Sequence, residues 1–278
     1  MPLYQVVVLA LVQAFTEFLP ISSTAHLALS RWLLGWAGDG SMSDLTFDIA
    51  LHAGTLLATM IYFFRDWLQI AAQAFGVDYQ PDPEIARNKR LLWMLAAATL
   101  PVGIIGFAFE KYAETVFRGP LVIAAMLIGV GIIMGIADRR HDLKKGIDRV
   151  TWGDSVTIGF AQALAIIPGT SRSGITMTAS LFRGLKRDTA ARFSFLLSTP
   201  ALLGAAIMAF RDVLKAGGIP PELMTSFVVG VVVSAATGWL VIAWLLRYLR
   251  TRTLRFFVYY RVVFGIIVIA LVLFRRAG

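Results

Sequence analysis

Two short stretches of this chain place hydroxyl and ionisable side chains inside otherwise apolar sequence. The first reads 13-QAFTEFLPISSTAH-26 and the second reads 162-QALAIIPGTSRSGIT-176. Each contains a proline followed by a cluster of serine and threonine. A hydroxyl beside a carboxylate or an imidazole is typical of an activated nucleophile, and an arginine offers a donor fork for phosphate or carboxylate. The two stretches therefore indicate chemistry on an anionic group.

The first stretch supplies the groups for acid–base work. Glu17 and His26 bring a carboxylate and an imidazole, which suit proton transfer or metal binding. Ser23 precedes His26 by three positions, so a helix would place both on one face. We predict that Glu17, Ser23 and His26 are catalytic, with Ser23, His26 or water as the nucleophile. Gln13, Ser22 and Thr24 are then predicted to line the substrate.

The second stretch supplies a positive charge. Arg172 follows the Pro168-Gly169 break, far from any loop, and is predicted to hold an anionic substrate as a fourth catalytic residue. Serine and threonine after a proline are good helix caps, so unpaired N–H groups of a new helix should face the same ligand. The predicted substrate-binding residues here are Gly169, Thr170, Ser171, Ser173 and Thr176.

The composition says which kind of protein must position these residues. Hydrophobic residues make up 58% of the 278 positions, charged residues 15%, and the mean hydropathy is +0.72. No polar stretch is long enough for a separate soluble domain, so we predict a single polytopic membrane domain. The formal net charge is +9, and most of the lysines and arginines lie in short loops between apolar runs. We therefore expect this charge to set membrane topology and to meet lipid headgroups rather than nucleic acid.

Hydrophobic periodicity divides the chain into six spans and two broken segments. The predicted spans are residues 45–64, 91–109, 121–137, 193–210, 226–246 and 256–274. Residues 3–34 and 156–182 are also apolar, but each is interrupted in the middle by proline. Because proline ends a helix and serine or threonine begins the next, each broken segment is predicted to be a re-entrant hairpin of two half-helices.

The two halves of the sequence resemble one another. Gln13 matches Gln162, Pro20 matches Pro168, and Phe47 matches Phe193 at nearly constant offset. This predicts a duplication with residues 1–140 as the first repeat and 150–278 as the second. One hairpin plus three spans is an odd number of crossings, so the second repeat should insert upside down, as in inverted-repeat transporters.

Loop charges give the predicted orientation. Seventeen of the 26 lysines and arginines fall in the loops that alternation places on one side, mainly within residues 65–90, 139–149, 183–192 and 247–255. The positive-inside rule makes that side cytoplasmic and puts both termini on the outer side of the membrane. The two hairpins then enter from opposite faces, and their tips should meet.

At these residues the chain resembles the undecaprenyl-diphosphate phosphatases of the bacitracin-resistance type, over essentially its full length. The second motif, 168-PGTSRSGIT-176, fits that family's pattern, as does the span beginning 47-FDIALHAGTLLA-58. The first motif departs from it, because Gln13 replaces a glutamate and Ala14 and Ala25 replace glycines. The resemblance implies a bacterial plasma-membrane hydrolase that converts undecaprenyl diphosphate into the monophosphate carrier and inorganic phosphate for cell-wall synthesis.

The resemblance also implies partners and a cofactor. The expected partners are a polyprenyl diphosphate and membrane lipids, with a homodimer as a further option and no nucleic acid. A divalent cation such as Mg²⁺ or Ca²⁺ would use Glu17, although Gln13 brings a carbonyl oxygen without charge. The competing hypothesis is a transporter or flippase of a polyprenyl phosphate lipid, because inverted repeats with broken helices are typical of transporters.

Overall fold

The computed structural model describes residues 2–36, 42–115, 117, 119–215 and 217–277. Within these ranges the chain forms helices and connecting loops, without a β-strand. Helices satisfy their backbone polar groups internally, which a bilayer requires of any segment that crosses it. The predicted all-α class is confirmed.

The six predicted spans are present as helices. Five helices in the described ranges are long and apolar enough to cross a membrane, namely α6 (Leu91–Thr115), α7 (Pro120–Asp138), α10 (Arg187–Lys215), α11 (Pro221–Leu249) and α12 (Arg255–Ala277). The sixth apolar stretch lies in α3 (Met42–Tyr62), which is followed by α4 (Phe64–Ala74) at a bend of 67°. The chain is therefore a multi-pass membrane protein. Short helical turns occur at α5 (Pro83–Ala86), η1 (Ile147–Arg149) and η2 (Leu164–Ile166).

The two broken segments fold as helical hairpins. The first consists of α1 (Leu3–Phe18) and α2 (Ser23–Leu33), and the second of α8 (Trp152–Ala163) and α9 (Arg172–Phe182). At 1.5 Å per residue the longest of the four, α1, extends only ~24 Å, less than the ~30 Å hydrocarbon core. Each break carries the predicted proline, and the partner half-helices pack on one another.

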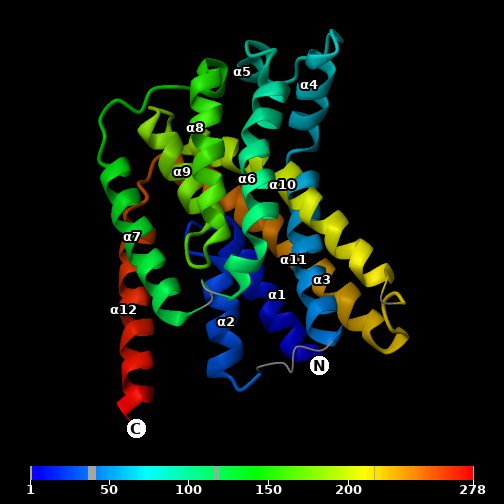
Figure 1. Cartoon of the computed structure of the whole chain (residues 1–278). Coiled ribbons are helices and arrows are strands. Elements are labelled where there is room, and N and C mark those ends of the chain that lie inside the picture. Colours follow the sequence, from blue (N-terminus) through cyan, green and yellow to red (C-terminus); the bar gives the residue numbers. More distant parts are fainter. Residues whose placement is uncertain (1, 37–41, 116, 118, 216, 278) are drawn as a thin grey trace.

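The hairpins approach each other from opposite ends of the helical bundle. Figure 1 shows both chain termini at the lower end, from which α1 and α2 rise, while α8 and α9 descend from the upper end. The connections near α4, α5 and α8 lie at the upper end. The hairpin breaks consequently lie near the middle of the bundle.

The inverted duplication of residues 1–140 and 150–278 stays a prediction, and several packing relationships agree with it. Helix α1 packs along α11, whereas α8, its counterpart in the second half, packs along α6. Helices α7 and α12, which end the two halves, pack on each other. A twofold relation between halves would produce this exchange of partners.

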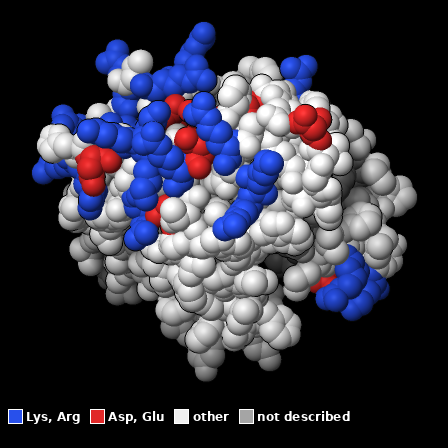
Figure 2. All heavy atoms as spheres, turned by 90° about the horizontal axis from the view of Figure 1, so that it is seen from above, with Lys and Arg blue, Asp and Glu red and all other residues white. Residues whose placement is uncertain are grey.

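Lysine and arginine side chains gather at the upper end of the molecule, as Figure 2 shows from above. Several of them form ion pairs with acidic side chains. Arg192 pairs with Asp66 at 2.6 Å and with Asp82 at 2.8 Å. Partial burial raises the pKa of Asp82, but the Arg192 guanidinium and the backbone N–H groups of Glu84 and Ile85 together hold the pKa below its usual value. The 75–90 segment is thereby fastened to the start of α10.

Two glycines allow the hairpins and spans to pack closely. A Cβ at Gly159 of α8 would lie 2.4 Å from the carbonyl oxygen of Ala98 in α6. A Cβ at Gly54 of α3 would lie 2.5 Å from the Cβ of Ser234 in α11. Small residues at such crossings let helix backbones approach closely, which drives helix association in lipid. These contacts hold the frame around the hairpin tips.

Candidate active site

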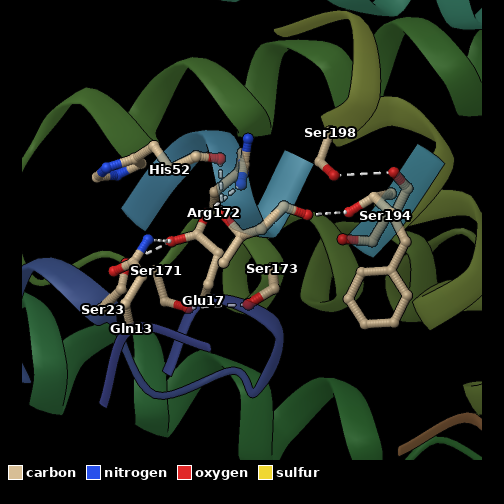
Figure 3. A network of polar contacts seen from close by, with 12 residues as sticks. Gln13, Glu17, Ser23, His52, Ser171, Arg172, Ser173, Ser194 and Ser198 are labelled. Atoms are coloured by element: carbon tan, nitrogen blue, oxygen red, sulfur yellow. Dashed lines mark hydrogen bonds and ion pairs between the residues drawn. The ribbon is translucent and has the colours of Figure 1, made fainter. Parts of the chain in front are cut away.

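Glu17 and Arg172 join the two hairpin tips. Glu17 lies in the last turn of α1, Arg172 is the first residue of α9, and Nη2 of Arg172 forms an ion pair with Oε1 of Glu17. A second link comes from Ser173, whose hydroxyl donates to the carbonyl oxygen of Leu19 at 3.1 Å. Figure 3 shows the residues of both hairpins converging here. The two tips are therefore in direct contact.

This ion pair is largely withdrawn from solvent. The Glu17 side chain is 7% exposed and the Arg172 side chain 18%. Desolvating two charges costs free energy that their attraction repays only with good geometry, so a buried ion pair is weak evidence for a stabilising role. Ionisable groups at this depth are a mark of function in membrane proteins.

Ser23 and Gln13 complete the surroundings of the Glu17 carboxylate. The hydroxyl of Ser23 donates to Oε2 of Glu17 at 2.7 Å, and the amide nitrogen of Gln13 donates to the same oxygen at 3.1 Å. The amide oxygen of Gln13 is buried and has no hydrogen-bond partner among the described residues. A carboxylate within 2.7 Å of a hydroxyl is positioned to take its proton.

Ser22 and Ser171 share an unusual backbone conformation. Each immediately precedes a half-helix, and their φ angles are +78° and +67°, the only positive values among described residues other than glycine. Helix N-cap residues normally have extended backbone angles, and a positive φ costs a residue with a Cβ roughly 1–2 kcal/mol. Such strain persists where the surrounding structure enforces it, and it concentrates at functional sites.

The first turns of both half-helices have unpaired donors. Within the described part of the chain no hydrogen-bond acceptor faces the backbone N–H groups of residues 22–24 or 171–173. The positive ends of two helix dipoles add to Arg172 at this place. Because Glu17 offsets only one positive charge, the junction of the tips favours an anionic ligand.

The remaining residues of the second motif shape this tip. Gly169 has a φ of +92°, and a Cβ there would lie 2.5 Å from the carbonyl oxygen of Ile123. The hydroxyl of Ser171 accepts from the N–H of Gly174 at 3.2 Å and so caps α9. Thr176 donates to the carbonyl of Arg172 at 2.7 Å. The buried hydroxyl of Thr170 has no partner among described residues.

His26 lies apart from this cluster. Its Nδ1 is 2.7 Å from the carbonyl oxygen of Ser22, its Nε2 is 2.7 Å from the hydroxyl of Tyr260, and its ring stacks on Phe264. The carbonyl can only accept, so Nδ1 carries the proton. The structure thus differs from the expected pairing of His26 with Ser23, because both ring nitrogens are engaged elsewhere. Thr24, also predicted to line the substrate, is exposed.

The donor set does not make a cage for a resident metal ion. In the described ranges no three His, Asp or Glu side chains converge. Both oxygens of Glu17 are already engaged, one by Arg172 and the other by Ser23 and Gln13. Divalent cations need several oxygen ligands, usually including carboxylates, and the buried unpaired oxygens of the described tip residues are two neutral ones, the amide oxygen of Gln13 and the hydroxyl of Thr170. The expected Mg²⁺ or Ca²⁺ ion therefore does not fit the side chains of the described tip residues.

Sequence reasoning did not assign a role to Arg261. This residue of α12 is fully buried, and its guanidinium bonds to backbone carbonyls at both hairpin breaks. The available signal was a charged residue in the middle of the apolar run 256–274. His52 of α3 is exposed, and its Nδ1 lies 2.8 Å from the carbonyl oxygen of Asp48 in the same helix.

Comparison with known proteins agrees with this constellation along the whole chain. The chain is 44% identical to the undecaprenyl-diphosphatase of Pelotomaculum thermopropionicum over 278 residues, which covers 100% of each protein. It is 44% identical to the undecaprenyl-diphosphatase of Moorella thermoacetica over 277 residues, covering 99% of this chain and 100% of that one. For the undecaprenyl-diphosphatase of Trichlorobacter lovleyi the identity is 45% over 272 residues, with 98% and 97% covered.

The match to a protein family is of similar extent. A family model described as bacitracin resistance protein BacA matches residues 6–267, a range that begins inside the first hairpin, includes both tips and ends inside the sixth apolar span. Both motifs that carry the tip residues lie inside that range. This chain belongs to the bacitracin resistance protein BacA family.

Proposed function

We propose that this chain hydrolyses undecaprenyl diphosphate to undecaprenyl phosphate and inorganic phosphate, and so returns the lipid carrier to cell-wall synthesis. The observation that carries the proposal is the junction of the tips, where a hydroxyl, a carboxylate and an arginine meet beside two helix N-termini. Its relatives bear the name of this activity. Phosphoryl transfer depends mainly on positioning and on neutralising the equatorial oxygens, and this junction suits both needs.

Binding of the diphosphate requires Arg172 to change partner. In the structure the Arg172 guanidinium pairs with the Glu17 carboxylate. A diphosphate carries more negative charge than one carboxylate and accepts a bidentate fork, so it would draw Arg172 away. The free N–H groups of residues 22–24 and 171–173 would then bind the remaining oxygens. The exchange leaves Glu17 free to act as a base.

Ser23 is our candidate for the nucleophile because its hydroxyl already donates to Glu17 at 2.7 Å. As Oγ of Ser23 attacks the terminal phosphorus, Glu17 takes the hydroxyl proton. The anhydride P–O bond breaks, and undecaprenyl phosphate leaves with that proton. A water molecule then attacks the phosphoserine. Glu17 accepts a proton from this water and returns it to the serine oxygen as inorganic phosphate departs.

His26 then has a supporting role in this scheme. Its ring holds the carbonyl of Ser22 from one side and bonds to Tyr260 on the other. Ser22 adjoins the nucleophile and has the strained φ, so His26 helps fix the turn that presents Ser23. In the proposed scheme His26 does not contact the reacting atoms, and Glu17 is the base.

The contacts between the hairpin tips favour hydrolysis over transport. Transport would require the tips to part so that a headgroup could pass between them. Three sets of contacts oppose this separation, namely the Glu17–Arg172 pair, the Ser173–Leu19 bond and the bonds of Arg261 to both breaks. A fixed junction suits a catalytic site that must keep its groups in register.

The setting follows from the substrate. A lipid tail can remain in the bilayer while its headgroup enters between the hairpins, which suits a bacterial plasma-membrane enzyme. We place the basic upper end in the cytoplasm and both termini on the periplasmic side by the positive-inside rule. A homodimer stays a prediction from the family resemblance.

The direct test is phosphate release from undecaprenyl diphosphate by the purified chain in lipid nanodiscs. We expect release of one phosphate per substrate, with the monophosphate as the other product. A matched arm with a chelator, followed by readdition of Mg²⁺ or Ca²⁺, tests the divalent cation. Intact substrate after long incubation, with and without added cation, would exclude the proposed activity.

A further inference from the structure

The side chain of Arg261 touches both hairpin breaks. It belongs to α12, far from either hairpin in the sequence, and its relative exposure is 0%. Nη1 donates to the carbonyl of Pro20 at 3.1 Å. Nη2 donates to the carbonyls of Gly169 and Thr170, each at 3.0 Å. One guanidinium thus connects the first break to the second.

The same guanidinium is fixed to the surrounding frame. Nε donates to the carbonyl of Leu127 at 3.1 Å and Nη2 to that of Met126 at 3.2 Å, both in α7. Among the described residues no carboxylate pairs with Arg261, and the partners of its guanidinium are backbone carbonyl groups. A buried charge without a counterion is costly. That cost indicates that these contacts serve a purpose beyond packing.

The carbonyls at the breaks are those that helix geometry leaves without partners. The carbonyl groups of Pro20, Gly169 and Thr170 accept no backbone hydrogen bond within the described residues. Buried carbonyls need donors, and Arg261 supplies them. A peptide group is planar and trans, so fixing the Thr170 carbonyl toward Arg261 turns the N–H of Ser171 the opposite way. The N–H of Ser171 is one of the unpaired donors of the second tip.

We propose that Arg261 is a positioning residue of the phosphatase: its guanidinium sets the register of the two hairpin tips and the direction of their peptide groups. This inference rests on the function proposed above. It gives Arg261 no contact with substrate, because all five of its hydrogen bonds go to the protein backbone. It also explains how residues from two hairpins keep a common geometry.

Two glycines leave room for this guanidinium. A Cβ at Gly131 of α7 would lie 3.2 Å from the Cβ and 3.7 Å from the Nε of Arg261. A Cβ at Gly174 of α9 would lie 3.3 Å from its Nη1. Gly129, one half-turn away on α7, faces open space. Gly131→Ala should therefore displace Arg261, whereas Gly129→Ala should leave it in position. Both variants keep the charge of Arg261.

The experiment combines kinetics with a distance measurement. The chain has no cysteine, so cysteines introduced at Ser30 of α2 and Phe182 of α9 would be the only sites that take a spin label. The distance between the hairpins is read by double electron–electron resonance in nanodiscs. Phosphate release from undecaprenyl diphosphate is measured on the same variants without labels. Arg261→Lys keeps a positive charge but loses the five-donor fork.

We expect Arg261→Lys to broaden the distance distribution between the hairpins. It should lower kcat by about 100-fold, because a small misplacement of catalytic groups costs about that factor in rate. KM should change by less than about threefold. Gly131→Ala, which keeps the guanidinium, should lower kcat by about tenfold with the same broadening. The matched controls, Gly129→Ala and Arg255→Lys at the exposed start of α12, should behave as the parent.

The readouts separate this inference from the proposed function. Parent values of kcat in Arg261→Lys and Gly131→Ala would overturn it, as would a fall in kcat with an unchanged distance distribution. A parent chain that releases no phosphate would defeat the proposed function, and the distance measurement would still decide whether Arg261 sets the register of the tips. Should Arg261→Lys fail to fold, Gly131→Ala against Gly129→Ala decides alone.

Discussion

Glu17 and Arg172 are separated by 155 positions in the sequence, yet they form one ion pair where the two hairpins meet. The same carboxylate accepts the hydroxyl of Ser23 at 2.7 Å. The pair therefore connects an anion-binding group to a base and its nucleophile. If Arg172 leaves Glu17 and binds the diphosphate, substrate binding is coupled to activation of Ser23. The same movement holds the diphosphate and frees Glu17 to act as the base.

Replacing Arg172 with lysine tests the need for a planar fork. Arg172→Lys keeps the charge but presents a point charge in place of two parallel donors. We expect kcat to fall by about 100- to 1,000-fold, the usual effect of removing one donor to developing charge in a transition state. Arg31→Lys is the matched control, because Arg31 pairs with Asp48 away from the tips. A turnover close to that of the parent in Arg172→Lys would remove Arg172 from this role.

Replacing Glu17 with glutamine tests the base. Glu17→Gln keeps the shape and can still accept a bond from Ser23, but it cannot take a proton at neutral pH. We expect phosphate release to fall by about 100- to 10,000-fold, the usual contribution of a positioned general base. Membrane insertion and thermal unfolding are measured alongside, with Glu84→Gln at the periphery as control. An active Glu17→Gln enzyme would show that another group serves as base.

The sequence predicted much of this fold because apolar length and proline breaks are local signals. The spans, the half-helices beginning at Ser23 and Arg172, and the meeting of Glu17 with Arg172 all follow from such patterns. The direction of the His26 ring could not be predicted, because it depends on Tyr260 and Phe264 from the other end of the chain.

The role of Arg261 and the backbone strain also lay beyond the sequence. Arg261 finds its partners among backbone carbonyls, which carry no signature in residue type. The positive φ of Ser22 and Ser171 occurs at residues that normally avoid it, so the residue type predicts extended backbone there. Tertiary packing of the two tips enforces both features.

Relieving the strain at Ser22 should stabilise the fold. Glycine tolerates a φ of +78° without a steric cost, and the Ser22 side chain makes no capping bond that would be lost. We expect Ser22→Gly to raise the free energy of unfolding by about 1 kcal/mol. Ser171→Gly should gain less, because the Ser171 hydroxyl caps the N–H of Gly174, a bond worth about 1 kcal/mol. Thermal unfolding in nanodiscs compares the two. Equal shifts would show that capping at Ser171 adds nothing.

The proposed orientation can be mapped with single cysteines on the cysteine-free chain. Gln80 lies exposed in the segment after α4, and Asp212 lies exposed near the end of α10. In Figure 1 the segment after α4 lies at the upper end of the bundle, and α10 runs downward away from it. A membrane-impermeant thiol reagent should label Asp212→Cys in intact cells and Gln80→Cys only after the membrane is opened. The reverse pattern would invert the proposed orientation, with both termini in the cytoplasm.

The most direct measurement is the stereochemical course of hydrolysis at the terminal phosphorus. A substrate made chiral there with sulfur and oxygen isotopes is hydrolysed in isotopically labelled water, and the configuration of the released thiophosphate is determined. Attack by Ser23 followed by water involves two in-line displacements, each of which inverts the phosphorus. A phosphoserine intermediate therefore gives net retention. Net inversion would mean that water attacks the diphosphate directly, and it would contradict Ser23 as the nucleophile.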